Sequence, residues 1–325
     1  MTSNFNRRHA LKLLGFTLLS SQLKAATDKA LRGIFPIMAT PFTSSNEVDY
    51  EDLENEVEFM SRCGAQGMVW PQLASEYQYL SRDERRRGMR TLAKAIKGKK
   101  PALVLGIQAA TKDDAVEYAE LAEELSPDAV IAIPPTAAKS LDDFHAYYRT
   151  LSRITKRPFF IQTSGGAPGI NFTVESLIEM AHELPNFGYV KEEESPLYER
   201  VRALAAARPP IKAVFTGPFD FYVMRVGCDG IMPGPVYPDI DVQIWDLYHS
   251  GREEKAREIF SKRLLMVNAE QNIPGIRPYI MKKRGVFKTA SSRRDNPRLT
   301  ADAIREIDFE FEGLKPYFKV DSNAL

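Results

Sequence analysis

Lys191 is the residue whose type and surroundings point most directly to chemistry. It closes the segment FGYVK (187–191), which is otherwise apolar and aromatic and is typical of a β-strand. Apolar surroundings disfavour the charged ammonium of a lysine, and a neutral amine can attack a ketone to form a Schiff base. The alternative is that Lys191 begins a solvated loop and pairs with one of the glutamates at 192–194. Residue types alone leave these two interpretations evenly matched.

Other groups near this position could do acid–base work. Glu76 and Tyr77 stand together in a polar turn and would supply a carboxylate and a phenol. Glu193 follows Lys191 closely, although a solvated helix start is the slightly favoured interpretation of Glu193 and Glu194. The glycines around Gly166 predict a flexible loop over the site. A phosphate-binding loop is the rival interpretation, but it lacks the required lysine and Ser/Thr.

Short apolar runs alternate with amphipathic stretches along the chain, which indicates a parallel sheet covered by helices on both faces. The strands are expected at 33–42, 67–71, 101–106, 128–135, 158–162, 187–191, 211–217 and 229–234. Asp49, Ser81 and Thr173 are expected to cap the helices that follow them. No G-x-G-x-x-G follows the first strand, so a dinucleotide-binding sheet loses support.

These elements predict one α/β domain over residues 30–325, a (β/α)₈ TIM barrel. A doubly wound sheet is the alternative architecture for such β–α alternation. Beyond about residue 252 the pattern becomes helical, at 252–270, 275–284 and 300–313. No long Pro/Gly/Ser linker precedes these stretches, so they are predicted to form a C-terminal helical appendix of the barrel. A barrel presents its functional residues at the C-terminal ends of its strands, where Lys191 would lie.

The composition is that of an ordinary globular protein. The chain has 325 residues and a net charge of +1, which gives no sign of a nucleic-acid partner. Cys63 and Cys228 are expected to be buried free thiols. No Cys/His cluster has the spacing of metal ligands, so no metal site is predicted.

The N-terminus has the layout of an export signal. Arg7 and Arg8 precede an apolar stretch from Leu13 to Leu19, and small residues follow at Ala25 and Ala26. The paired arginines resemble a twin-arginine signal, predicted over residues 1–26, and the apolar stretch is too short to span a membrane. The predicted location is therefore the periplasm, without stable membrane insertion after signal removal. The alternative is a basic tail on a cytoplasmic protein.

Several segments together resemble the dihydrodipicolinate synthase/N-acetylneuraminate lyase family, in order and spacing, from residue 33 to about 315. They are GIFPIMATPFTSSNEVDYEDL, GMVWPQLASEYQYLSRDER, VIAIPP, PFFIQTSGGAPGINFT, NFGYVKEEES and GCDGIMPG. The resemblance implies a Schiff-base aldolase or dehydratase that acts on 2-keto acids through Lys191, without a metal or an organic cofactor. It also implies a homo-oligomer, a tetramer or a dimer, which light scattering would detect.

The sequence departs from the family pattern where the resemblance places catalytic and binding groups. In the family, a catalytic tyrosine and two threonines relay protons. The resemblance places Gln162 at the position of the tyrosine and Leu73 and Ala74 at those of the threonines. An inter-subunit tyrosine corresponds to Thr136, a glycine to Gln72, and a carboxylate-binding arginine to Ala167. Because the whole relay is replaced, the resemblance implies a changed reaction and makes dihydrodipicolinate synthase activity doubtful.

The predicted function is a Schiff-base lyase, an aldolase or dehydratase, for a 2-keto acid that is sugar-derived. The segment GIMPGPVYPD, with Gly234, is more similar to sugar-acid dehydratases than to the synthase. An exported ligand-binding barrel that has lost catalysis is the alternative. The predicted catalytic residues are Lys191, Glu76 and Tyr77, and the predicted substrate-binding residues are Gln162, Gln72, Ala74, Ser75, Gly166 and Gly234.

Overall fold

The computed structural model describes residues 29–294 and 299–320. The description below concerns the unit Leu31–Leu325. The predicted signal at residues 1–26 lies outside the described residues, so it stays a prediction.

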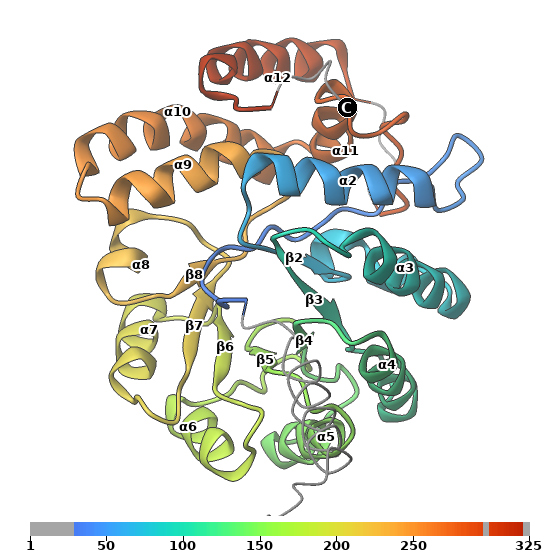
Figure 1. Cartoon of the computed structure of the whole chain (residues 1–325), viewed down its shortest axis with the longest axis vertical. Coiled ribbons are helices and arrows are strands. Elements are labelled where there is room, and N and C mark those ends of the chain that lie inside the picture. Colours follow the sequence, from blue (N-terminus) through green and yellow to red (C-terminus); the bar gives the residue numbers. More distant parts are fainter. Residues whose placement is uncertain (1–28, 295–298, 321–325) are drawn as a thin grey trace, which may run out of the picture. The chain divides into compact units, whose positions relative to one another are not determined.

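Eight parallel strands form a nearly closed barrel with helices between them, which confirms the predicted TIM barrel (Figure 1). The hydrogen-bonded order is β1-β8-β7-β6-β5-β4-β3-β2. The strands are β1 (Gly33–Ile34), β2 (Gly67–Trp70), β3 (Ala102–Gly106), β4 (Ala129–Ala132), β5 (Phe159–Gln162), β6 (Tyr189–Glu192), β7 (Ala213–Thr216) and β8 (Gly230–Ile231). An isolated parallel bridge between Ile37 and Val69 joins the β1 and β2 ends of the sheet.

The first strand is much shorter than the predicted run 33–42. Only Gly33 and Ile34 pair with β8, and the chain then continues through isolated bridges at Ile37 and Phe42. Pro36 and Pro41 lie in this run, and a proline has no N–H to donate to a sheet ladder. The apolar pattern therefore predicted the burial of this segment correctly but overestimated its pairing.

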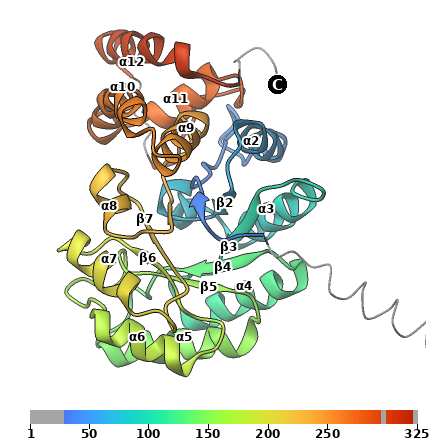
Figure 2. The same ribbon diagram turned by 60° about the vertical axis from the view of Figure 1, so that its left-hand side comes forward.

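Helices cover the outside of the barrel (Figures 1 and 2). They are α2 (Tyr50–Cys63), α3 (Arg82–Ala95), α4 (Lys112–Leu125), α5 (Leu141–Ile154), α6 (Val174–Glu183), α7 (Leu197–Ala206), α8 (Phe221–Arg225) and α9 (Pro238–His249). Asp49, Ser81 and Thr173 cap α2, α3 and α6 as predicted, because each side chain accepts backbone N–H bonds from the first turn.

Two apolar clusters stabilise the barrel. The inner cluster fills its interior and includes Phe35, Phe160 and Phe215, whose rings lie 5.1–5.2 Å apart in edge-to-face pairs. The outer cluster lies between the strands and the helices. Cys63 and Cys228 belong to it as buried free thiols, as predicted.

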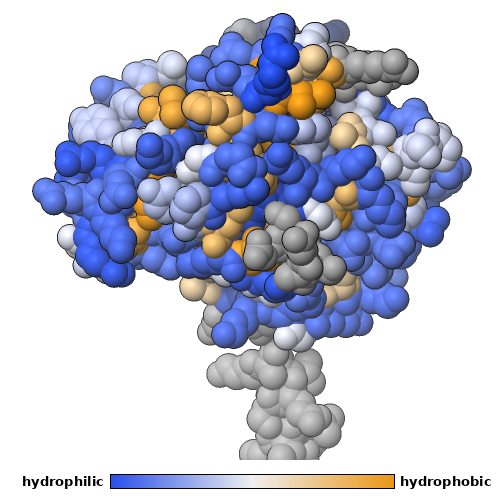
Figure 3. Space-filling view, turned by 90° about the horizontal axis from the view of Figure 1, so that it is seen from above, coloured by the Kyte–Doolittle hydropathy of each residue, from blue (hydrophilic) through white to orange (hydrophobic). Residues whose placement is uncertain are grey.

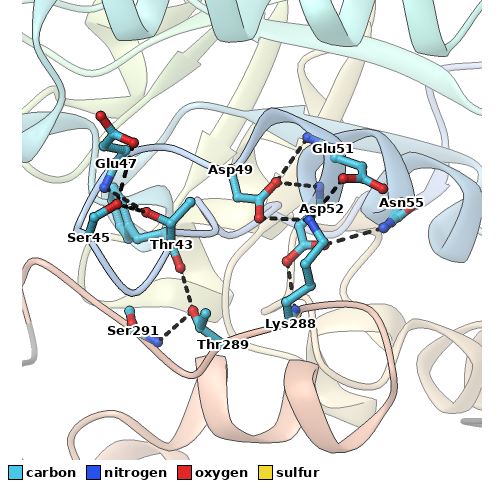
Figure 4. A network of polar contacts seen from close by, with 11 residues as sticks. Thr43, Ser45, Glu47, Asp49, Glu51, Asp52, Asn55, Lys288, Thr289 and Ser291 are labelled. Carbon is cyan, nitrogen blue, oxygen red and sulfur yellow. Dashed lines mark hydrogen bonds and ion pairs between the residues drawn. The ribbon is translucent and has the colours of Figure 1, made fainter.

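The C-terminal appendix consists of α10 (Glu253–Asn272), α11 (Ile276–Lys283) and α12 (Ala301–Leu314), beside α9 (Figure 2). A polar network joins the segment after α11 to the start of α2 (Figure 4). In it, the Lys288 ammonium lies 2.8 Å from Asp49 and 3.2 Å from Asp52, and Thr289 donates to the carbonyl of Phe42. These contacts fix the loop that follows α11 against the barrel.

Glu56 is a fully buried carboxyl on α2. Its Oε1 accepts the Ala39 N–H at 2.9 Å, and its Oε2 has no partner among the described residues. Burial raises the pKa of Glu56 well above its ordinary value. The folded protein therefore keeps this proton at pH values where the unfolded chain, with an ordinary pKa of 4.5, has lost it.

The raised pKa of Glu56 makes the stability depend on pH. Its contribution is fully present below pH 4.5 and is lost as the pH rises toward the folded-state pKa. Because of this group, each unit of rising pH in that window should lower the free energy of unfolding by up to about 1.4 kcal/mol. Urea unfolding at pH 5 and pH 9 should show a smaller pH effect in Glu56→Gln than in wild type or in the exposed control Glu54→Gln. Parallel pH profiles in all three proteins would contradict this expectation.

The surface seen from above is largely hydrophilic, with apolar patches between the polar side chains (Figure 3). Large exposed apolar residues include Leu264 and Leu265 on α10 and Phe309 on α12, two helices that contact each other. The homo-oligomer implied by the resemblance stays a prediction.

Within residues 29–294 and 299–320, no helix is both long and apolar enough to cross a membrane.

Candidate active site

Lys191 lies inside the barrel, near the C-terminal end of β6. Side chains alternate between the two faces of a strand, so Lys191 shares the inward face with Tyr189. Tyr189 packs on Phe160 with the ring centroids 5.1 Å apart, and Phe160 belongs to the inner cluster. The lysine is therefore placed one layer above an aromatic floor, and only 3% of its surface is exposed.

The Lys191 ammonium belongs to a closed ring of four polar side chains, with Gln162, Ser164 and Glu193. Its Nζ donates to Gln162 Oε1 at 3.1 Å and lies 3.0 Å from Glu193 Oε1. Gln162 Nε2 donates to Ser164 Oγ at 3.2 Å, and Ser164 Oγ donates to Glu193 Oε2 at 2.5 Å. Gln162 and Lys191 are direct neighbours in the β5–β6 register. Every contact in the ring joins a donor to an acceptor, so the ring fixes both the lysine and the carboxylate.

Glu193 is the carboxylate nearest to the lysine nitrogen. It comes just after β6, and helix α7 does not begin until Leu197, so the expected solvated helix start at Glu193 is wrong. Gly217, after β7, makes room for it: a Cβ there would lie 2.1 Å from Glu193 Oε1. The absence of a side chain at Gly217 therefore allows the Lys191–Glu193 contact.

Glu192 has a structural role in the same strand. Its side chain is on the opposite face from Lys191, fully buried, and 2.9 Å from Arg200 Nη2. It also accepts from Thr163 Oγ1 at 2.8 Å and from the backbone N–H of Glu194 at 2.8 Å. Of the three consecutive glutamates, Glu193 is thus the one that faces Lys191.

A cavity of about 440 Å³ opens above Lys191. This volume is within the range of small-molecule sites. Four of the predicted binding residues line it together with Lys191 and Glu193: Gln72, Ala74, Gln162 and Gly234. Gln72 is buried and donates from Nε2 to Gln108 Oε1 at 3.0 Å, while its own Oε1 has no partner among the described residues.

Ser75 and Glu76 lie beside the cavity but are occupied by other contacts. Ser75 Oγ donates to the Met38 carbonyl at 2.5 Å and accepts the Gln72 N–H at 3.0 Å. Glu76 has a left-handed backbone, with φ 59°, and its carboxylate accepts from Ser292 Oγ and from the N–H groups of residues 293 and 294. Both side chains therefore hold loops in place around the site.

Tyr77 and Gly166 are not brought to the Lys191 cavity. Tyr77 lines a separate cavity of about 360 Å³ together with Thr136, and burial raises the pKa of its phenol. Gly166 packs against Pro134, where a Cβ would approach to 2.7 Å. Ala167, at the place of the implied arginine, is buried.

The residues that reach the cavity from the C-terminal helices were not predicted from the sequence. Arg263 and Glu270 of α10 and Arg277 of α11 all line it. Ser164, in the ring with Lys191, was not predicted either. Within the described residues no set of three or more His, Cys, Asp or Glu is placed to hold a metal ion.

The geometry defines a class of protein: a (β/α)₈ barrel with a buried lysine and a partner carboxylate at the catalytic face. The sequence matches the model of the Dihydrodipicolinate synthetase family over residues 30–302. The chain therefore belongs to this family, and it is an enzyme of the lyase class.

Individual relatives are distant but cover most of the chain. A 4-hydroxy-tetrahydrodipicolinate synthase from Chlorobium luteolum is 27% identical over 295 residues, which are 88% of this chain and 98% of the relative. An L-2-keto-3-deoxyarabonate dehydratase from Azospirillum brasilense is 25% identical over 289 residues, 85% and 92% of the two chains. The crystal structure of dihydrodipicolinate synthase from Rhodopseudomonas palustris superposes on this chain with a TM-score of 0.80 at 21% sequence identity. The superposition covers 87% of this chain and 97% of the synthase chain, which shows that the two share the fold.

Proposed function

We propose that the enzyme is a Schiff-base dehydratase that removes water from a sugar-derived 2-keto-3-deoxy acid. The observation that carries this proposal is the Lys191 ammonium, buried in the cavity 3.0 Å from the Glu193 carboxylate. A lysine nucleophile with an adjacent base is the arrangement that covalent catalysis on a ketone requires. The similarity to a keto-deoxy-sugar-acid dehydratase supports the choice of reaction.

In the first step Glu193 takes a proton from the Lys191 ammonium, and the free amine forms a bond to C2 of the keto acid. The C2–O bond then breaks, and the oxygen leaves as water after taking up protons from the amine and from Glu193. An iminium remains, so the positive charge of the ammonium is conserved. Gln162 Oε1, 3.1 Å from Nζ, positions the amine for this attack.

In the second step the iminium acts as an electron sink, which makes the C3 proton acidic. The Glu193 carboxylate removes that proton, and the electron pair of the C–H bond forms an enamine. The enamine then expels the C4 hydroxyl, which leaves as water with the proton that Glu193 returns. One carboxyl thus serves as both base and acid, and hydrolysis of the unsaturated iminium frees Lys191.

Incubation with a panel of 2-keto-3-deoxy sugar acids tests this proposal, with the products identified by mass spectrometry. We expect a product that has lost one water from its substrate. Release of pyruvate and a shorter aldehyde would instead assign aldol cleavage. No turnover and no adduct on any member of the panel would favour the ligand-binding barrel that has lost catalysis.

We expect little or no dihydrodipicolinate synthase activity. The positions to which the resemblance assigns the proton relay hold Gln162, Leu73 and Ala74, none of which has a group that titrates. General acid–base help is typically worth about 10²–10⁴-fold in rate, so its loss should be plain. A coupled assay with pyruvate and aspartate semialdehyde measures this activity. Turnover at an ordinary enzymatic rate would contradict the expectation.

We also propose that the enzyme is exported in folded form through a twin-arginine signal. The support is the pair Arg7 and Arg8 ahead of a modest apolar stretch. Replacing both arginines with lysine keeps the charge and should leave the precursor in the cytoplasm, as seen by immunoblotting of cell fractions. Normal export and processing of this variant would count against the twin-arginine route.

A further inference from the structure

The cavity above Lys191 extends to the C-terminal helices, and its far wall is polar. Arg263 and Glu270 of α10, Arg277 of α11 and Gly234 after β8 line this part. A smaller cavity of about 90 Å³ shares Glu270 and Arg277, together with Ala74 and Arg294, so the Arg277–Glu270 pair stands between the two spaces. None of these residues is needed for the chemistry at Lys191.

Arg277 and Glu270 hold each other in a fixed arrangement. Arg277 Nε donates to Glu270 Oε2 at 3.1 Å, and only 8% of the Glu270 side chain is exposed. Within the described part of the chain, the two terminal nitrogens of Arg277 and the second oxygen of Glu270 have no other protein partner. A fixed donor group and a fixed acceptor therefore stand side by side on the cavity wall.

Arg263 differs from Arg277, although it lines the same wall. Its guanidinium pairs with the buried carboxylate of Asp241, which accepts from Nη2 at 3.1 Å. Arg263 thus pairs with a fully buried carboxylate behind the wall, whereas the carboxylate partner of Arg277, Glu270, itself lines the cavity.

Gly234 keeps the Arg277–Glu270 pair open to the cavity. A Cβ at this position would lie 3.3 Å from Glu270 Oε2 and 3.5 Å from Arg277 Nε. Any side chain there would crowd the pair. The glycine thus leaves room for a ligand group at this point.

We infer that Arg277 and Glu270 form a subsite for the hydroxyl groups at the end of the substrate remote from its keto group. A hydroxyl both donates and accepts hydrogen bonds, so it matches an arginine donor beside a carboxylate acceptor. A second substrate carboxylate fits less well, because Glu270 would repel it. The ligand class is therefore a 2-keto acid with a polyhydroxylated chain. This inference rests on the proposed function, since Lys191 must hold the other end.

Borohydride trapping on Lys191 measures the selectivity. For each keto acid, the trapping gives the concentration at which the initial rate of inactivation is half of its maximum. The preference for one keto acid over another is the ratio of these two concentrations. The probes are 2-keto-3-deoxygluconate, 2-oxohexanoate with the same carbon number but no hydroxyls, and 2-oxoadipate with a terminal carboxylate. We expect the wild type to prefer 2-keto-3-deoxygluconate over 2-oxohexanoate by about tenfold or more, the usual effect of hydrogen bonds to charged groups. Arg277→Gln and Glu270→Gln should each bring this ratio close to one.

Gly234→Ala is a second kind of variant, which keeps both charged groups. It tests the subsite even if Arg277→Gln and Glu270→Gln do not fold. It should lower the same ratio by crowding the pair, whereas Arg257→Gln, on the exposed face of α10, should leave the ratio unchanged. An unchanged ratio in a folded Arg277→Gln or Gly234→Ala variant overturns the subsite, and so does a wild-type preference for 2-oxoadipate. If the wild type traps pyruvate on Lys191 but shows no preference, only the subsite fails. If it traps no keto acid, the proposed function fails with it.

Discussion

Lys191→Ala is expected to abolish turnover of the keto-acid substrate, with a loss of about 10⁴-fold or more, the order found when a covalent nucleophile is removed. The reason is that no neighbouring side chain in the ring replaces the amine, since Gln162, Ser164 and Glu193 cannot form an iminium. Steady-state kinetics and borohydride trapping should both fall to background.

The fold of the Lys191→Ala variant should survive, because it removes a buried charge and leaves a small residue beside a cavity. The Glu193 carboxylate keeps its hydrogen bond from Ser164 and its access to the cavity. Circular dichroism and thermal unfolding check this. A folded variant that retains substantial turnover would show that the lysine is not the nucleophile.

Glu193→Gln is expected to lower kcat by about 10²–10⁴-fold, the range that general acid–base catalysis typically contributes. The amide has nearly the shape of the carboxylate and can still contact Lys191 and Ser164, but it cannot carry a proton between C3 and the C4 oxygen. KM should change much less than kcat, because the cavity walls remain as they are. The trapped adduct on Lys191 should still form, though more slowly.

Glu194→Gln is the matched control for Glu193→Gln, because Glu194 is the adjacent glutamate and does not belong to the residues that line the cavity. Its turnover should stay within a few-fold of the wild type. Equal losses in the two variants would point to a general effect of charge near β6. An unaffected Glu193→Gln enzyme would exclude Glu193 as the proton carrier.

The architecture was predictable because local signals and burial agreed along the chain. Asp49, Ser81 and Thr173 cap their helices in the structure as their side chains indicated, and short apolar runs became strands buried on both faces. The exception is the first strand, where Pro36 and Pro41 cannot donate to the ladder. The apolar pattern predicts burial, and it says less about which backbone groups pair.

The position of Lys191 could be predicted, and pairing with one of the glutamates at 192–194 was one of its two interpretations, but the sequence did not indicate which glutamate. Glu193 reaches the lysine because Gly217, which follows strand β7, leaves space for it, and no local pattern links these two positions. Glu76 and Tyr77 carry groups suited to acid–base chemistry, yet Glu76 binds residues 292–294 and Tyr77 lines another cavity. Contacts made between distant segments decided which polar groups face the cavity.

For the C-terminal helices, too, the sequence does not indicate which polar residues face the cavity. Arg277 and Glu270 lie in ordinary charged helical sequence, and nothing in their spacing indicates that they reach the cavity above Lys191. Gly234 was predicted as a binding residue through the resemblance, and its physical role became visible only beside this pair.

The most direct measurement of the central claim is borohydride reduction of the wild-type enzyme with pyruvate and with 2-keto-3-deoxygluconate, followed by intact mass and peptide mapping. A Schiff base on Lys191 predicts one reduced ligand mass per chain, located on the peptide that contains Lys191 and absent from Lys191→Ala. Absence of any adduct with a broad panel of 2-keto acids, or an adduct on another lysine, would contradict the assignment of Lys191 as the catalytic nucleophile.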